Sequence, residues 1–149
     1  MSASAKQKLY SSFWLADRWY GIEVMRVQEV TRPLAFTPVP LAPPYVKGLI
    51  NLRGQLATLV DLRSYLGLGE SMQEKSMFVF CQAGGQLIAL LVDQIGDVVE
   101  THSEQFETTP EVLAGDIRAV LGGIYKIKKD ILSVLDMDAV SEKLLSQKI

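Results

Sequence analysis

Side chains that could perform catalysis or bind a metal are scarce in this sequence. His102 is its one histidine and Cys81 its one cysteine, so the usual ligand set of a zinc site cannot be built. His102 lies on a polar segment, where a helix start or solvent contact is more common than catalysis. Cys81 lies in an apolar run, which is typical of a core residue. We predict that the protein is not an enzyme and needs neither a metal nor a cofactor.

Two other patterns resemble phosphate or nucleic-acid sites only in part. Gly84–Gly85 and Gly122–Gly123 stand in strand contexts and lack the spacing of a phosphate-binding loop. Lys126, Lys128 and Lys129 form a small basic hairpin tip, for which a solvated turn is the simpler interpretation. With 15 Lys and Arg against 17 Asp and Glu, charge gives no reason to expect a nucleic-acid partner. An oligonucleotide-binding small barrel is therefore only an alternative of a different class.

Length and hydropathy predict one compact domain. The chain has 149 residues, of which 48% are hydrophobic, and this is enough to bury a core. No apolar run approaches the roughly 18–20 residues that span a bilayer, and residues 1–8 lack the apolar segment of a signal peptide. We expect a cytoplasmic protein without direct membrane insertion, in which residues 1–8 are a flexible N-terminus.

Residues 46–63 predict the central element of the fold, two strands joined by a tight turn at Arg53. The strand after the turn is apolar on both alternating sets, as expected inside a core. Asn51, Arg53, Thr58 and Asp61 interrupt this stretch with polar side chains that need partners once buried. We expect Asp61 to cap a short helix that follows the second strand.

Further strands follow from apolar runs that are separated by turn residues. Residues 24–30 read as one short helix or a bent strand, and the proline-rich residues 32–45 as a connection over the surface. Asp138 is predicted to cap a C-terminal helix. The predicted hairpins span residues 9–23, 77–92 and 120–137.

The chain also repeats itself. A shift of 75 positions places Gly48 on Gly123 and Asp61 on Asp136, and a shift of 68 places Val27 on Ile95. A chance match of apolar strands is the simpler explanation. We favour two similar β units of about five short strands each, with mostly antiparallel pairing. The groove between two such units is a natural binding site.

Three blocks of sequence resemble the CheW family of bacterial chemotaxis coupling proteins. The first block contains Tyr20–Val24 and Val27–Val30, the second is Gly48–Gly54 followed by Leu59–Arg63, and the third is Val92–Val98. The blocks stand in the family's order and at matching spacing, and the resemblance covers about residues 9–145. One departure is Thr58, where the family often has a proline, which affects only the expected shape of the strand.

The resemblance implies a mainly β fold of two packed five-stranded SH3-like barrels, with short helices and a C-terminal helix. Residues 9–149 would form a single CheW-like domain. Its two barrel subdomains would span about residues 12–70 and 75–140, with exchange of strands between them allowed.

The resemblance also implies a non-catalytic adaptor that couples methyl-accepting chemoreceptors to a histidine kinase of the CheA type. The regulatory domain of the kinase would pack barrel end against barrel end. The cytoplasmic tip of the receptor, a helical hairpin, would lie in the groove between the barrels. Such a protein would be recruited from the cytoplasm to receptor arrays at the membrane. A CheW-like coupler of a pilus-motility or other non-flagellar pathway is the alternative of the same class.

The family's receptor-binding groove can be carried over by position. Each apolar position could instead be ordinary core, and Arg53 could instead clamp a buried carboxylate such as Asp61. The matching apolar positions are Val24, Val27, Ile95 and Val98. The matching polar positions are Gln28 and Glu29 at the rim, with Arg53 as the arginine of the family signature.

Overall fold

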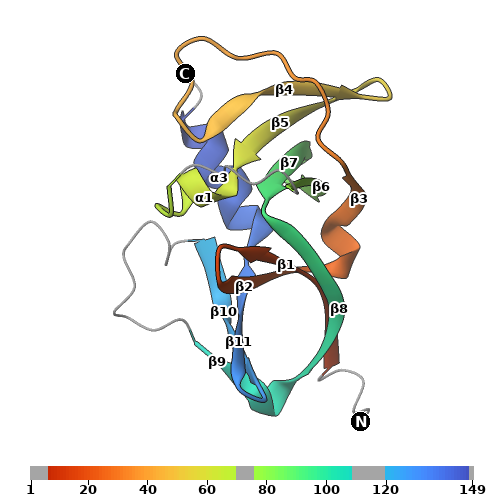
Figure 1. Ribbon diagram of the computed structural model, residues 1–149, viewed down its shortest axis with the longest axis vertical. Helices are drawn as coiled ribbons and strands as arrows, with labels where there is room; N and C mark the ends of the chain where they lie inside the picture. Colours follow the sequence, from red (N-terminus) through yellow and green to blue (C-terminus); the bar gives the residue numbers. More distant parts are fainter. Residues whose placement is uncertain (1–6, 70–75, 109–119, 148–149) are drawn as a thin grey trace.

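The computed structural model describes residues 7–69, 76–108 and 120–147, and strands dominate it (Figure 1). The first described strands are β1 (Gln7–Leu15) and β2 (Arg18–Glu23), followed by the 3-10 helix η2 (Val24–Arg26) and β3 (Val27–Thr31). Next come β4 (Val46–Leu52), β5 (Gln55–Asp61), α1 (Leu62–Tyr65), β6 (Met77–Ala83) and β7 (Gln86–Val92). The remaining elements are β8 (Gln94–His102), η3 (Ser103–Gln105), β9 (Phe106–Glu107), β10 (Leu121–Ile127), β11 (Asp130–Leu135) and α3 (Met137–Gln147).

The strands form two sheets, each of which belongs to a separate unit of the molecule. The middle unit has the order β3-β6-β7-β5-β4, and the terminal unit has the order β8-β1-β2-β11-β10-β9. In Figure 1 the middle unit lies above the terminal unit. Neither sheet comes from one half of the chain, because β1 and β2 pair with strands of the C-terminal half. The strand exchange that the sequence left open is therefore present in this structure.

The internal repeat is confirmed strand by strand. In the middle unit β5 runs parallel to β7, with Ala57 opposite Leu87, and in the terminal unit β11 runs parallel to β2, with Leu132 opposite Trp19. The shift of 75 relates Ala57 to Leu132, and the shift of 68 relates Trp19 to Leu87, so the two parallel pairs are equivalent in the repeat. The β4–β5 and β10–β11 ladders each shift register next to the equivalent glycines, Gly48 and Gly123. The two units are therefore related in pairing as well as in sequence.

One hydrophobic cluster is shared by both units and by α3. It includes Phe13 and Ile22 from the terminal unit, Val60 and Leu90 from the middle unit, and Val140 from α3. Smaller clusters lie within each unit. A core that crosses the boundary makes the two units pack as one body.

The predicted buried strand is β5. Ala57 through Asp61 are buried, whereas Leu56, at the start of the strand, is 65% exposed. Asp61 caps α1 as predicted, since its side chain accepts a hydrogen bond from the backbone N–H of Ser64. Asn51 accepts one from the N–H of Gly54 at 2.7 Å, which stabilises the β4–β5 turn.

Two predictions at the chain ends need correction. Gln7 and Lys8 were expected in a flexible N-terminus, but they pair with His102 and Thr101 in the β1–β8 ladder; residues 1–6 lie outside the described residues. The cap of α3 is Asp136 and not Asp138, because Asp136 Oδ1 accepts from the N–H groups of residues 138 and 139 at 3.1 and 3.2 Å. Asp138 instead pairs with Arg26 at 2.7 Å.

Residues 24–30 combine both predicted alternatives, a 3-10 turn that leads into a strand. The proline-rich connection is exposed or half-buried and is held to the sheet by a bridge between Thr37 and Leu49. Among the described helices, none has the length and apolar character that crossing a bilayer requires.

Candidate binding surface

The reactive residue types have structural roles. Cys81 is buried in β6, and burial raises the pKa of its thiol to about 12, so it is protonated at neutral pH. His102 is the N-cap of η3, where its N–H donates to Gln105 Oε1 at 2.9 Å. Within the described ranges, no three His, Cys, Asp or Glu residues gather as metal ligands.

The three polar positions carried over from the family lie together. The two terminal guanidinium nitrogens of Arg53, Nη1 and Nη2, donate to the Glu29 carboxylate at 2.6–2.7 Å. Gln28 donates to Gln55 at 3.0 Å and accepts from Gln82 at 2.5 Å. We call these five residues the polar network. It joins β3, β6 and the β4–β5 turn into one exposed surface.

The polar network also closes the middle unit. β3 and β4 are the two end strands of its sheet, and the contacts of Arg53 and Gln55 connect the β4–β5 turn back to β3. Arg53 adopts a positive φ of 50° in this turn. Asp61, the example given for a carboxylate clamped by Arg53, lies at the opposite end of β5 and caps α1; the carboxylate that Arg53 binds is that of Glu29.

The four apolar positions are divided between the two units. Val24 and Val27 lie on η2 and β3 and are half-buried, whereas Ile95 and Val98 lie on β8. Val27 and Ile95 both pack against the shared core cluster, and Val98 is 60% exposed. Val27 and Ile95 are therefore partly core residues, as the alternative interpretation expected, whereas Val98 is not. The described cavity that contains Ile95 and Val98 does not include Val24 or Val27.

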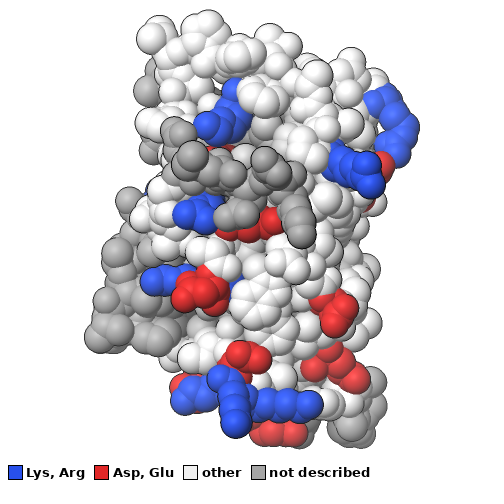
Figure 2. Space-filling view, in the orientation of Figure 1, with Lys and Arg blue, Asp and Glu red and all other residues white. Residues whose placement is uncertain are grey.

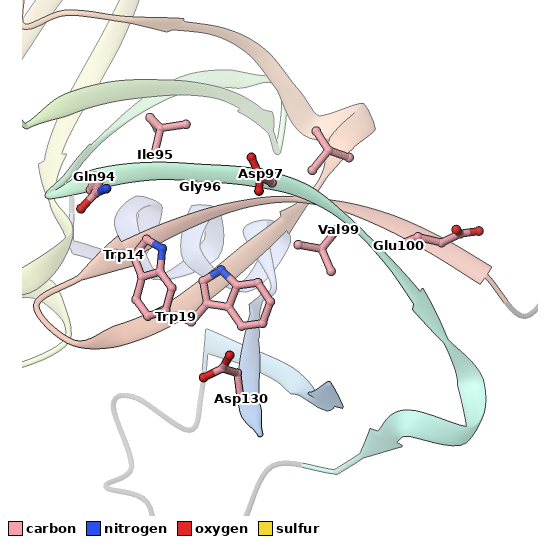
Figure 3. Close-up of a pocket in the computed structure, with 10 residues that line it drawn as sticks. Trp14, Trp19, Gln94, Ile95, Gly96, Asp97, Val99, Glu100 and Asp130 are labelled. Carbon is pink, nitrogen blue, oxygen red and sulfur yellow. The ribbon is translucent and has the colours of Figure 1, made fainter. Parts of the chain in front are cut away.

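That cavity contains a feature that the sequence analysis missed. It measures about 630 Å³ and is lined by residues 94–100 of β8, by Trp14 and Trp19, and by Asp130. The two indole rings stack with centroids 5.8 Å apart and planes 17° apart. Figure 3 shows them side by side below β8. We call this cavity the tryptophan cleft. The predicted hairpin of residues 9–23 places Trp14 opposite Trp19, but we did not predict that β8 pairs with β1 beside them.

A second cavity, of about 370 Å³, lies between the N-terminus of α3 and β10. Tyr10 and Tyr125 meet there with hydroxyl oxygens 3.5 Å apart, and burial raises the pKa of Tyr10 above its usual range. The ion pair of Arg26 and Asp138 lies at the same cavity. Its mixed charges favour no particular ligand.

The charged residues are interspersed on the visible face of the molecule. Figure 2 shows Lys and Arg among Asp and Glu there, without a continuous basic surface. Nucleic-acid binding depends on such a surface, because phosphate contacts supply most of the affinity. This face gives no support to the oligonucleotide-binding alternative.

Known proteins share both sequence and fold with this chain. Residues 10–144 match the family described as CheW-like domain. The chemotaxis protein CheW of Klebsiella aerogenes is 30% identical over 135 residues, which cover 90% of this chain and 79% of that protein. The chemotaxis protein CheW of Treponema pallidum is 28% identical over 153 residues, with 99% and 88% covered.

A solved structure agrees with these sequences. The scaffolding protein TtCheW from Thermoanaerobacter tengcongensis superposes with a TM-score of 0.81 at 26% identity, covering 88% of this chain and 90% of that one. The agreement confirms the predicted mainly β fold of two packed SH3-like barrels. In the described residues β9 adds a short sixth strand to one of the two sheets. From the family match and the shared fold, the chain belongs to the CheW-like domain family.

Proposed function

We propose that this protein is a non-catalytic adaptor that couples chemoreceptors to a CheA-type histidine kinase in chemotaxis signalling. The observation that carries the proposal is the polar network, in which Arg53 of the family signature binds Glu29 beside half-buried Val27. The relatives that cover most of the chain are named chemotaxis proteins CheW, and the solved neighbour is a scaffolding protein. Such an adaptor works from the cytoplasmic side, as part of receptor arrays.

The receptor contact would use the boundary between the two units. A helical hairpin presents apolar side chains at spacings of three and four residues, and Val24 and Val27 offer one apolar contact of matching spacing. Ile95 and Val98, also three positions apart, offer a second apolar contact on β8. The polar network at the edge would fix the orientation of the hairpin through hydrogen bonds.

The kinase contact would use a separate surface, a barrel end that packs against a barrel end of the kinase's regulatory domain. Separate surfaces allow both partners to bind at once. The adaptor can then bias the kinase between its active and inactive arrangements according to the state of the receptor.

The direct test measures the affinity of a purified receptor-tip hairpin for single variants. Val27→Asp should weaken binding at least tenfold, because it places a charge against an apolar helix. Met25→Asp is the matched control: Met25 lies in the same segment but is 94% exposed, and its change should leave affinity unaltered.

Val98→Asp is a second test variant in case Val27→Asp impairs folding. Val98 is 60% exposed, so its change should not unfold the protein. Binding of the kinase's regulatory domain should be retained in all three variants. Unchanged receptor affinity in both Val27→Asp and Val98→Asp would refute the proposed receptor surface.

A further inference from the structure

We propose that the tryptophan cleft binds an arginine-bearing segment of a partner protein. The cleft is lined by the stacked indoles of Trp14 and Trp19 and by three residues with carboxylates, Asp97, Glu100 and Asp130, of which Asp130 lies below the indoles in Figure 3. No lysine or arginine is among its lining residues. This inference goes beyond coupling and does not require that the receptor proposal is correct, although Ile95 and Val98 of the proposed receptor contact also line the cleft.

The internal repeat explains why the cleft is open. In the middle unit, the surface that corresponds to the cleft is covered by hydrogen-bonded side chains. Gln82 of β6 donates to Gln28 of β3, and Gln28 donates to Gln55 at the start of β5. The same two sequence shifts place Trp14, Gly96 and Asp130 at these three positions. Gly96, which replaces Gln28, has no side chain with which to bridge the cleft. All three replacements line the cleft.

Packing requires glycine at this position. A Cβ atom on Gly96 would overlap Ser12 Oγ, and that hydroxyl donates to the carbonyl oxygen of Asp97. Ser12 is 1% exposed, so its hydroxyl has little room to move. The packing of β1 against β8 therefore leaves no room at position 96 for a side chain that could bridge the cleft.

The repeat also indicates the charge of the missing group. Glu29 of the middle unit binds the guanidinium of Arg53, and the equivalent residues in the terminal unit are Asp97 and Lys128. Within the described part of the chain, no ion pair joins Lys128 to Asp97, and none involves Glu100 or Asp130. The terminal unit thus presents the carboxylate of this pair without its guanidinium.

Arginine fits this site better than other cations. Its planar guanidinium can stack on an indole face and at the same time form two parallel hydrogen bonds to a carboxylate. Ile95, Val98 and Val99 line the same cleft and suit aliphatic residues on either side of the arginine. Three carboxylates disfavour phosphate or acidic ligands by like-charge repulsion.

The chain offers a direct optical readout. It contains two tryptophans, and both line the cleft, so intrinsic fluorescence reports this site alone. The probe is the blocked peptide acetyl-Ala-Val-Arg-Val-Ala-amide, titrated into the full-length protein at low salt. We expect a saturable change in tryptophan emission that weakens as salt is added. The same peptide with citrulline, a neutral isostere of arginine, should bind at least tenfold more weakly.

Variants locate the binding site, with the anisotropy of a labelled peptide as readout. The double variant Asp97→Asn, Asp130→Asn should weaken binding at least tenfold. Its matched control is Asp17→Asn, Glu104→Gln, which removes two exposed carboxylates outside the cleft and should change affinity little. Val27→Asp should also leave peptide binding intact, which separates this result from the receptor test.

Three outcomes would overturn the proposal. The first is equal binding of the arginine and citrulline peptides. The second is an equal loss of affinity in the cleft variant and its control. The third is the absence of any fluorescence change at millimolar peptide in low salt.

Discussion

At the scale of single residues, Arg53 and Glu29 show what sequence can and cannot predict. The family resemblance identified both residues, but not that they bind each other across 24 positions of sequence. Only closure of the middle unit places the β4–β5 turn beside β3, and that closure depends on contacts distant in sequence. Arg53 remains 67% exposed in its side chain, so solvent screens the ion pair and its contribution to stability is at most about 1 kcal/mol.

Arg53→Ala should therefore lower receptor-dependent kinase activity while the melting temperature changes little. Arg53→Lys is the informative comparison, because it keeps the charge but loses the two-pronged hydrogen bonding to Glu29. Kinase assays in reconstituted receptor membranes and thermal unfolding measure the two effects. A fall of several degrees with unchanged signalling would assign Arg53 a structural role instead.

Cys81 predicts alkaline sensitivity of the fold. Burial raises its thiol pKa to about 12, whereas the unfolded thiol has a pKa of about 8.5. Below the unfolded pKa both states are protonated, so the full stability is present. As the pH rises from there toward about 12, the unfolded state alone releases its proton, so stability falls.

The free energy of unfolding, measured by urea titration between about pH 8 and 11, should therefore drop more steeply for the wild type than for Cys81→Ala. Tyr10 and Tyr20, whose pKa values are also raised by burial, contribute equally to both proteins and cancel in the comparison. The same dependence of the unfolding free energy on pH in wild type and Cys81→Ala would contradict the raised pKa of the Cys81 thiol.

At the scale of elements, the hairpins and the buried strand were predictable because turn residues and apolar runs are local signals. The cap of α3 was missed although the repeat contained it: Asp136 is the equivalent of Asp61, which caps α1. Asp138 is also a good capping residue type, and composition alone cannot choose between two aspartates two positions apart. The repeat was the better guide.

Asp136→Ala should lower the free energy of unfolding by about 1 kcal/mol, because two N–H groups at the start of α3 lose their acceptor. Asp136→Asn should retain most of that stability, since asparagine also caps helices. Asp138→Ala removes only an exposed ion pair with Arg26 and should cost less than Asp136→Ala. Urea unfolding of the three variants decides, and a larger loss for Asp138→Ala would contradict the assigned cap.

Gly48 tests the register of the β4–β5 ladder. A Cβ atom there would overlap the carbonyl oxygen of Thr37, which is backbone and cannot turn aside. Gly48→Ala should therefore destabilise the protein by about 2 kcal/mol or more. Gly122→Ala is the control, because its added Cβ would have no neighbour within 3.4 Å and its nearest contact is at 3.7 Å. Equal stability of the two variants, measured by thermal unfolding, would argue against this packing.

At the scale of the whole molecule, sequence predicted two β units but not how they share strands. The shifts of 75 and 68 relate equivalent strands, yet they do not say which hairpin joins which sheet. That choice is made by the parallel pairs β5–β7 and β2–β11, which connect distant segments and leave no local signal. The tryptophan cleft was missed for the same reason, because it forms only when β8 pairs with β1 beside the β1–β2 hairpin.

The hydrophobic cluster shared by the two units offers a physical link between two bound partners. Val27 and Ile95 pack on one cluster from two different units, so a helix held by both would contact a surface that spans the boundary. A second partner at a barrel end would then be linked to the first through a packed interior. We expect coupling to depend on occupation of both surfaces at once.

The central claim is tested by one measurement of simultaneous binding. Analytical ultracentrifugation of this protein with the receptor-tip hairpin and the kinase's regulatory domain should show a ternary complex, absent when this protein is omitted and reduced by Val27→Asp to its binary complex with the kinase domain. Competition between the two partners for one surface, or binding of neither, would contradict the account.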